Sequence, residues 1–272
     1  RAKARTRFMQ DTLGPEGLKE AFLKNVESAK AAGGLELPRL EALADVCGGE
    51  ETLEHPRAIR QKQPGMYTVK YHPVGGLLPV EKPARLYAAI KDLCNAECRV
   101  GPDETLYIVN LPAAGAEKVL ALTEDGAKTE FEYSVACIGA TVCQQGVRDS
   151  QGLLQAAVSA VREAGIPDGA LPRIRISGCP SSCAAHQAGT IGFQGGVRLE
   201  DKKPQPAFRL FLGGGDALDE ARFGEAGAVI LEKDIPALLV ELGRAAAAQG
   251  QSWAQWSESC REDLNAIVAK YA

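Results

Sequence analysis

The sequence of 272 residues predicts an α+β fold in which short strands and helices alternate along the chain. Residues 66–72 read as a strand, 83–93 as a helix, 105–111 as a strand and 112–122 as a helix. The alternation repeats on a larger scale after residue 150. The composition, 45% hydrophobic and 24% charged, is that of a folded globular protein.

The first part of the chain is predicted to begin with two helices. Pro15 and Glu16 open a helix that ends at Gly33-Gly34, and a second helical stretch covers residues 37–46. Turn-forming residues then lead into the strand at 66–72, where β-branched and aromatic side chains are typical of a sheet.

The second part is predicted to open with an amphipathic helix at 150–164, which Ser150 caps and Gly165 ends. The remaining predicted elements are strands at 173–177, 190–193 and 207–212, and helices at 235–248 and 258–269.

Charge and hydropathy exclude several partners. The 31 basic and 35 acidic residues give a net charge of -4, which indicates neither a nucleic-acid nor a membrane-surface partner. Because we find no signal peptide and no apolar run of the roughly 18 residues that a membrane span needs, we expect a cytoplasmic protein.

The chain opens on Arg1, and its first methionine is Met9, so we expect that an upstream part is missing.

Four of the eight cysteines predict a metal centre. They form a C-x5-C pair, Cys137 and Cys143, and a C-x3-C pair, Cys179 and Cys183, each in a loop at the boundary of an element. Small neighbours such as Gly139 let the backbone curl around an inorganic core and leave N–H groups free to donate to sulfur. The pattern favours a 4Fe–4S cluster and therefore a redox protein.

Other interpretations of these cysteines stay open from the residues alone. Structural zinc sites favour C-x2-C knuckles, disulfides need an oxidising compartment, and inert buried cysteines would not pair within loops rich in glycine and serine. Cys94 and Cys98 form another C-x3-C near the end of the helix at 83–93, and we expect them to be structural, like Cys47 and Cys260.

Two further features could serve a ligand. His186 follows Cys183 by three residues and could be a ligand or a proton donor, although a packing or hydrogen-bonding role is the simpler expectation. Gly213-Gly214-Gly215 precedes a stretch that we expect to be helical and could cradle an anion, or could simply form a turn.

The cysteine pattern resembles that of the siroheme-dependent nitrite and sulfite reductases. The similarity rests on Ala136–Cys143, a spacing of 35 residues, Cys179–Cys183, the strand before that pair and the tract Gly189–Gly195 after it. It implies the C-terminal half of such an enzyme: an N-terminal helical segment (1–57), a ferredoxin-like repeat (58–125), and an α/β domain that binds the 4Fe–4S cluster and siroheme (126–272).

The resemblance also implies roles for the cysteines. Cys137, Cys143, Cys179 and Cys183 would ligate the cluster, and Cys183 would bridge to the siroheme iron as its axial ligand. The implied reaction is the six-electron reduction of sulfite to sulfide or of nitrite to ammonia. The implied partners are an N-terminal half or second subunit and an electron donor such as ferredoxin or a flavoprotein.

The chain departs from the family in two places. Ser181 stands where the family often has asparagine, and the loop Gly101–Glu104 is acidic where the first repeat would be basic. No catalytic residue can be assigned, and we expect the chain alone to be inactive. The alternatives are a precorrin-3B synthase-like enzyme of the corrin pathway and a siroheme-free 4Fe–4S electron-transfer module.

Overall fold

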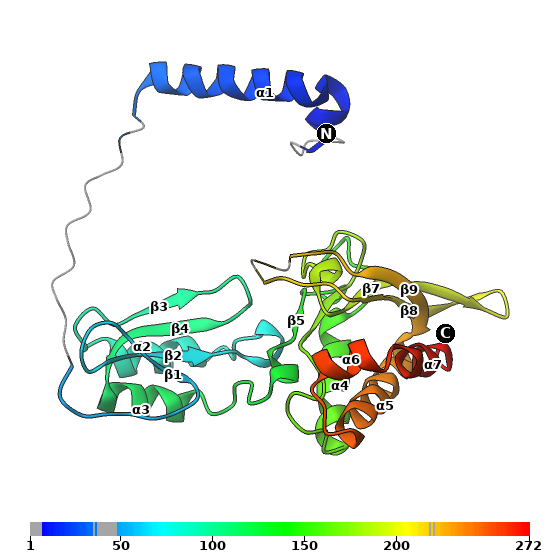
Figure 1. Ribbon diagram of the computed structural model, residues 1–272. Coiled ribbons are helices and arrows are strands. Elements are labelled where there is room, and N and C mark those ends of the chain that lie inside the picture. The colour runs from blue at the N-terminus through cyan, green and yellow to red at the C-terminus, as the bar shows by residue number, and fades with distance from the viewer. Residues whose placement is uncertain (1–6, 35, 37–47, 218, 220) are drawn as a thin grey trace. The chain divides into compact units, whose positions relative to one another are not determined.

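The fold was obtained as a computed structural model that describes residues 7–34, 36, 48–217, 219 and 221–272 (Figure 1). It divides into two units, Arg1–Asp45 and Val46–Ala272. Among the described residues, no helix has the length and apolar character needed to cross a membrane.

The first unit contains one long helix, α1 (Arg7–Ala32), with a break at Gly14 (φ 71°, ψ 171°). Pro15 follows the break, so the helix predicted from Pro15 to Gly33 forms and is preceded by a further helical stretch. Gly33 adopts a φ of 71°, as a glycine that ends a helix commonly does. The helix predicted at 37–46 lies outside the described residues.

The second unit begins with a four-stranded antiparallel sheet in the order β1-β2-β4-β3. Its strands are β1 (Ala58–Arg60), β2 (Met66–Tyr71), β3 (Glu97–Val100) and β4 (Leu106–Pro112). The central strands β2 and β4 confirm the prediction. The edge strands β1 and β3 were not predicted, because β1 is only three residues long and every residue of β3 is exposed, which leaves no alternating pattern.

Two helices, α2 (Lys82–Ile90) and α3 (Ala113–Leu122), complete this part of the fold, as predicted. The helix α3 packs against α2 and against the central strands β2 and β4. Their shared core is closed by buried side chains that include Tyr67, Val69, Tyr71, Leu86, Ile108, Leu111 and Val119.

A second sheet has five strands in the order β5-β6-β7-β8-β9. The strands β5 (Val135–Ala136), β6 (Ile174–Ser177) and β7 (Ile191–Glu200) run parallel, and β8 (Lys203–Leu212) and β9 (Glu225–Leu231) are antiparallel to their neighbours. Figure 1 shows β7 and β8 as one long hairpin. The sequence predicted only its inner part and missed β9, because the outer hairpin and the first residues of β9 are mostly exposed.

Four helices share the core of this sheet: α4 (Ser150–Glu163), α5 (Ile235–Ala248), α6 (Trp253–Ser259) and α7 (Arg261–Ala269). The helix α4 contacts β5 and β6, α5 packs against α4, and α6 and α7 pack against α5. The cap predicted at Ser150 is wrong by one residue, since Asp149 accepts the N–H of Gly152 and Ser150 is buried. The single helix predicted at 258–269 is also wrong, because non-helical Cys260 separates α6 from α7.

A buried amide joins the two cores of the second unit. The side chain of Gln151, at the start of α4, donates to the carbonyl oxygens of Gly75 and Ala136, both at 2.8 Å. Gly75 belongs to the turn after β2, and Ala136 is the last residue of β5. A side chain at Gly75 would collide with the Gln151 amide oxygen, since its Cβ would lie 2.4 Å away.

Glu104 crosses the same junction from the loop before β4. Its carboxylate lies against Gly76, where a Cβ would be 2.7 Å from Oε2, and this Oε2 atom has no hydrogen-bond partner among the described residues. Burial raises the pKa of Glu104 from an ordinary 4.5 to about 7, although the Ala136 N–H and the charge of Arg175 oppose the rise. The backbone of Glu104 is left-handed (φ 63°), which adds local strain.

We expect Glu104→Gln to stabilise the chain at alkaline pH. Glu104 keeps its proton to higher pH in the folded chain than in the unfolded chain, so the native protein loses stability as pH rises from about 4.5 through 7. Glutamine has nearly the same shape as glutamate but does not ionise. Because the side chain is only half-buried, the free energy of unfolding of the variant relative to the native chain should rise by about 1–2 kcal/mol between pH 5 and pH 8.

Urea unfolding at the two pH values measures this difference. The matched control is Glu124→Gln, because Glu124 is exposed. Its free energy of unfolding relative to the native chain should differ little between pH 5 and pH 8. A Glu104→Gln variant whose stability relative to the native chain is the same at pH 5 and pH 8 would contradict the assignment.

Candidate metal centre

The two predicted cysteine pairs follow neighbouring parallel strands. Cys137 comes directly after β5, and Cys179 comes two residues after β6, with Ala136 paired to Ile176 across the ladder. The Cys137 N–H continues the ladder by donating to the Ile176 carbonyl at 3.0 Å. Because parallel strands end at the same edge of a sheet, the loops that carry the two pairs leave the sheet side by side.

The first loop, residues 137–149, curls back on itself. The N–H of Cys143 donates to the Gly139 carbonyl at 2.8 Å, and the N–H of Ala140 donates to the Arg148 carbonyl at 3.0 Å. Gly139 has a φ of 71°, and a Cβ there would lie 2.8 Å from the Ser150 backbone nitrogen. The turn that brings Cys143 back toward Cys137 therefore requires glycine.

The second loop is locked to the first through Gly178. Its carbonyl accepts the N–H groups of Val147 at 3.0 Å and Arg148 at 2.9 Å. A Cβ at Gly178 would lie 2.5 Å from the Arg148 carbonyl oxygen. The chain can thus hold the two cysteine loops together only with a bare backbone at this position.

The Cys137 thiol already lies in a polar cradle. Its Sγ accepts the N–H of Gly178 at 3.1 Å and lies 3.2 Å from the Ser150 hydroxyl oxygen. Ser150 also donates to the Cys137 carbonyl at 2.7 Å, so its hydroxyl is fixed. The Gly178 N–H is a donor of the kind that stabilises the thiolate form that ligates iron.

The four cysteines differ in exposure, and none of them forms a disulfide. Cys179 is buried, Cys137 and Cys143 are half-buried, and Cys183 is exposed. Among the described residues, no group of three or more His, Cys, Asp or Glu side chains is placed to hold a single metal ion. The structure thus brings the two loops together without forming a single-ion site, and the assignment of the four ligands stays a prediction.

The donor set still fits an iron–sulfur cluster. It consists of thiols alone, on two loops that are joined by backbone hydrogen bonds and present an N–H donor to sulfur. The four thiolates that bind a 4Fe–4S cluster lie farther apart than four thiolates that bind a single metal ion, because each binds a different iron.

The other cysteines lie elsewhere. Cys94 follows α2 and Cys98 lies in the edge strand β3, and both are exposed. The exposure of both thiols does not fit the structural role that we expected for this pair, because an exposed strand begins just after the predicted helix. Cys260 packs against the core at the break between α6 and α7, and Cys47 lies outside the described residues.

His186 is fully buried, as the packing interpretation expected. Its ring lies 4.9 Å from the ring of Phe211, centroid to centroid. Burial lowers the pKa of His186, while the nearby Gln194 side chain acts in the opposite direction. The imidazole is therefore neutral near pH 7, which fits a packed residue better than a proton donor.

The glycines at 213–215 do not precede a helix. Gly215 forms an isolated bridge with Arg222, and the chain then enters β9. The helix expected after these glycines is therefore wrong, and with it the anion cradle at a helix N-terminus.

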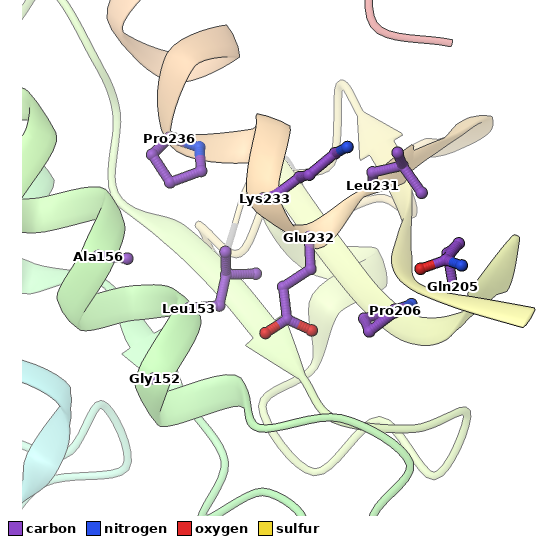
Figure 2. Close-up of a pocket in the computed structure, with 9 residues that line it drawn as sticks. All are labelled: Gly152, Leu153, Ala156, Gln205, Pro206, Leu231, Glu232, Lys233 and Pro236. Carbon is purple, nitrogen blue, oxygen red and sulfur yellow. The ribbon is translucent and has the colours of Figure 1, made fainter.

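A separate cavity of about 370 Å³ lies between α4, β8 and the start of α5 (Figure 2). Figure 2 shows the carboxylate of Glu232 near Leu153 and Gly152. Burial raises the pKa of Glu232, and Asp149 adds to the rise while Arg148 opposes it. None of the four predicted ligands lines this cavity, so it is not part of the candidate metal centre.

We expect Gly178→Ala to weaken the joint between the cysteine loops. The added methyl group would meet the Arg148 carbonyl at 2.5 Å and would force the loops apart. The free energy of unfolding, measured in urea under reducing conditions, should fall by about 1–3 kcal/mol. The control is Gly196→Ala on β7, where a Cβ would meet nothing within 4 Å. Equal stability of the two variants would contradict the account of Gly178.

Comparison with known proteins shows what the chain is similar to. Residues 59–125 match the nitrite/sulfite reductase ferredoxin-like half domain. The chloroplastic ferredoxin–nitrite reductase of Arabidopsis thaliana is 27% identical over 224 residues, which cover 79% of this chain and 36% of that protein. The ferredoxin–nitrite reductase of Synechococcus elongatus is 26% identical over 249 residues, which cover 89% of this chain and 46% of that protein.

A sulfite reductase also matches. The NADPH-type sulfite reductase hemoprotein beta-component of Bacillus subtilis is 26% identical over 147 residues, 46% of this chain and 26% of that protein. The chain thus spans less than half the length of these curated relatives.

The fold agrees with these matches. The structure of the NirA protein of Mycobacterium tuberculosis covers 97% of this chain with a TM-score of 0.68 and 22% identity, and the match covers 49% of NirA. The chain is thus similar to nitrite and sulfite reductases in its half domain at residues 59–125 and in the sequences of curated relatives, and it shares the fold of NirA.

Proposed function

We propose that the chain is the cluster- and siroheme-carrying C-terminal half of a sulfite or nitrite reductase. The observation that carries the proposal is the joining of the two cysteine loops at the edge of β5 and β6, in a chain that also contains the family's half domain. The proposed organisation is a helical segment (1–57), a ferredoxin-like repeat (58–125) and a cluster- and siroheme-binding domain (126–272).

Cys137, Cys143, Cys179 and Cys183 would hold a 4Fe–4S cluster, and Cys183 would also be the axial ligand of the siroheme iron. When bound, these groups supply the electrons and the anion-binding iron for the six-electron reduction of sulfite to sulfide or of nitrite to ammonia. The exposed position of Cys183 supports its assignment as the shared ligand, because a second group can reach it from outside the loop.

The residues around the cysteines would orient and protect the ligands. The Gly178 N–H would stabilise the Cys137 sulfur as a thiolate, and the Ser150 hydroxyl would hold the Cys137 backbone through its carbonyl. Burial of Cys179 would keep water from one side of the site. These residues position the ligands, and no catalytic acid is assigned to this chain.

The proposed partners follow from the length of the chain. An N-terminal half or a second subunit would supply the residues that clamp the anion, since the chain spans less than half of its curated relatives. The electron donor would be ferredoxin or a flavoprotein, and the names of the ferredoxin–nitrite reductases and of the NADPH sulfite reductase component support these two classes.

A second candidate is a 4Fe–4S electron-transfer module without siroheme. The arrangement of the cysteines supports it, because this function needs only the four thiols on the two joined loops.

Anaerobic reconstitution with iron and sulfide tests the cluster assignment. We expect about four irons and four labile sulfides per chain. Serine in place of Cys137, Cys143, Cys179 or Cys183 should lower this content severalfold, because each substitution removes a thiolate ligand. Matched Cys98→Ser and Cys260→Ser variants should keep it. Full cluster content in all four ligand variants would contradict the assignment.

Siroheme distinguishes the two candidate functions. With siroheme and the N-terminal half supplied, the reductase predicts magnetic coupling between cluster and haem in electron paramagnetic resonance spectra, and Cys183→Ser should lose the coupling. A chain that takes up the cluster but never siroheme, even with the other half present, would be the electron-transfer module.

A further inference from the structure

Arg175 lies in β6 beside the segment that carries Cys183. We call residues 183–189 the Cys183 loop. Arg175 pairs with Gly192 across the β6–β7 ladder, and its side chain is only 14% exposed. An arginine that is this enclosed must find several partners, because its guanidinium carries five donors and does not lose its charge.

The side chain of Arg175 contacts both ends of the Cys183 loop. At the first end, Nη1 donates to the carbonyl oxygen of Ala184, the residue after Cys183, at 3.3 Å. At the other end, its aliphatic stem lies against Gly189, where a Cβ would be 3.2 Å from the Arg175 Cβ and 3.3 Å from its Cγ. One side chain therefore spans the loop.

The guanidinium is itself held from the β8–β9 loop. Nη2 of Arg175 donates to the carboxylate of Asp216, and Arg173 approaches the other oxygen of that carboxylate at 3.5 Å. Burial alone would raise the pKa of Asp216, but the hydrogen bond from Arg175 and the two positive charges hold it below its ordinary value. Asp216 is thus ionised at neutral pH and fixes the direction of the guanidinium.

The Cys183 loop needs such support because its backbone is strained. Ser182 and Ala185 have left-handed φ values of 58° and 51°, which are unfavourable for residues with a Cβ. Three of its amides form short-range bonds: Ala185 donates to Ser182, Ala188 to Ala185 and Gly189 to His186. The longer-range backbone contacts are the Ala184 N–H to the Ser177 hydroxyl at 3.2 Å and the Gly224 N–H to the Gln187 carbonyl at 2.7 Å.

We propose that Arg175 is the positioning residue for Cys183: by joining the Ala184 carbonyl and Gly189 to Asp216, it fixes the Cys183 thiol beside the other cysteine loop. This inference rests on the proposed function for the role of Cys183, but the loop geometry that it explains does not depend on a bound group.

Hydrogen exchange of the full chain without iron tests the positioning directly. Arg175→Met keeps the aliphatic stem and removes the guanidinium. We expect amide exchange in residues 184–189 to become about tenfold faster, with exchange in the first cysteine loop, 137–149, unchanged. The matched control is Arg198→Met, because Arg198 also joins carbonyl oxygens, those of Val229 and Tyr271, to a carboxylate, that of Glu200. It should accelerate exchange near the C-terminus and leave the Cys183 loop unchanged.

If Arg175→Met does not fold, two milder variants test the same positioning role. Arg175→Lys retains the stem and the charge but not the forked donors, so exchange in the loop should be only about threefold faster. Asp216→Asn should have a similar effect, because it removes the charge that directs the guanidinium. Unchanged exchange of the loop in all folded Arg175 and Asp216 variants, or equal acceleration throughout residues 46–272, would overturn the proposal.

A second measurement separates this inference from the proposed function. In the anaerobically reconstituted chain, loss of cluster iron to a chelator should be about tenfold faster for Arg175→Met than for the native chain, and unchanged for Arg198→Met. If the native chain takes up no cluster, the proposed function fails while hydrogen exchange still decides the role of Arg175. If the cluster is taken up and both variants lose iron at the native rate, the positioning role fails and the function stands.

Discussion

The candidate centre depends on one constraint, the set of hydrogen bonds between Gly178 and the first cysteine loop. The Gly178 carbonyl accepts two N–H groups of that loop, and the Gly178 N–H donates to the Cys137 sulfur. Each contact needs the backbone of one loop to approach the backbone of the other, which only a residue without a Cβ permits. The parallel pairing of β5 and β6 provides the approach by ending both strands at one edge.

The junction between the two cores lies at the same edge of the second sheet, where β5 ends. Gln151 donates to the carbonyl of Ala136, the residue before Cys137, and the Ala136 N–H acts to lower the pKa of Glu104 in the same junction. The ferredoxin-like part is therefore attached directly beside the first cysteine loop. Arg175 continues the network toward Asp216 and the Cys183 loop, and its charge also acts on Glu104. Small polar contacts thus connect the half domain with both cysteine loops.

Sequence reasoning found the elements whose side chains carry a local pattern. The central strands β2 and β4 and the helices α2, α3, α4 and α5 have the expected periodicity and end signals. It missed the exposed edge strands β1 and β3 and the strand β9, whose first residues are small and exposed, because pairing with a neighbour and not local propensity forms them. It also joined α6 and α7, since one residue, Cys260, breaks an otherwise helical pattern.

The candidate site was predictable only in part for a related reason. The cysteine spacings identify the four candidate ligands, but the contacts that bring the loops together join residues far apart in sequence. Arg175 and Asp216 are separated by 41 positions, and Gly178 and Cys137 also by 41. Ser150 looked like a helix cap, and its place beside the Cys137 sulfur follows from the turn at Gly139, which no local pattern specifies.

The central claim is that the two cysteine loops together hold one four-iron cluster. A Mössbauer spectrum of the chain reconstituted with ⁵⁷Fe tests this most directly, because it reports the environment of every iron present. The account predicts that nearly all the iron gives the signal of a diamagnetic, thiolate-bound 4Fe–4S cluster in its oxidised state. A spectrum dominated by mononuclear iron or by two-iron clusters would contradict it.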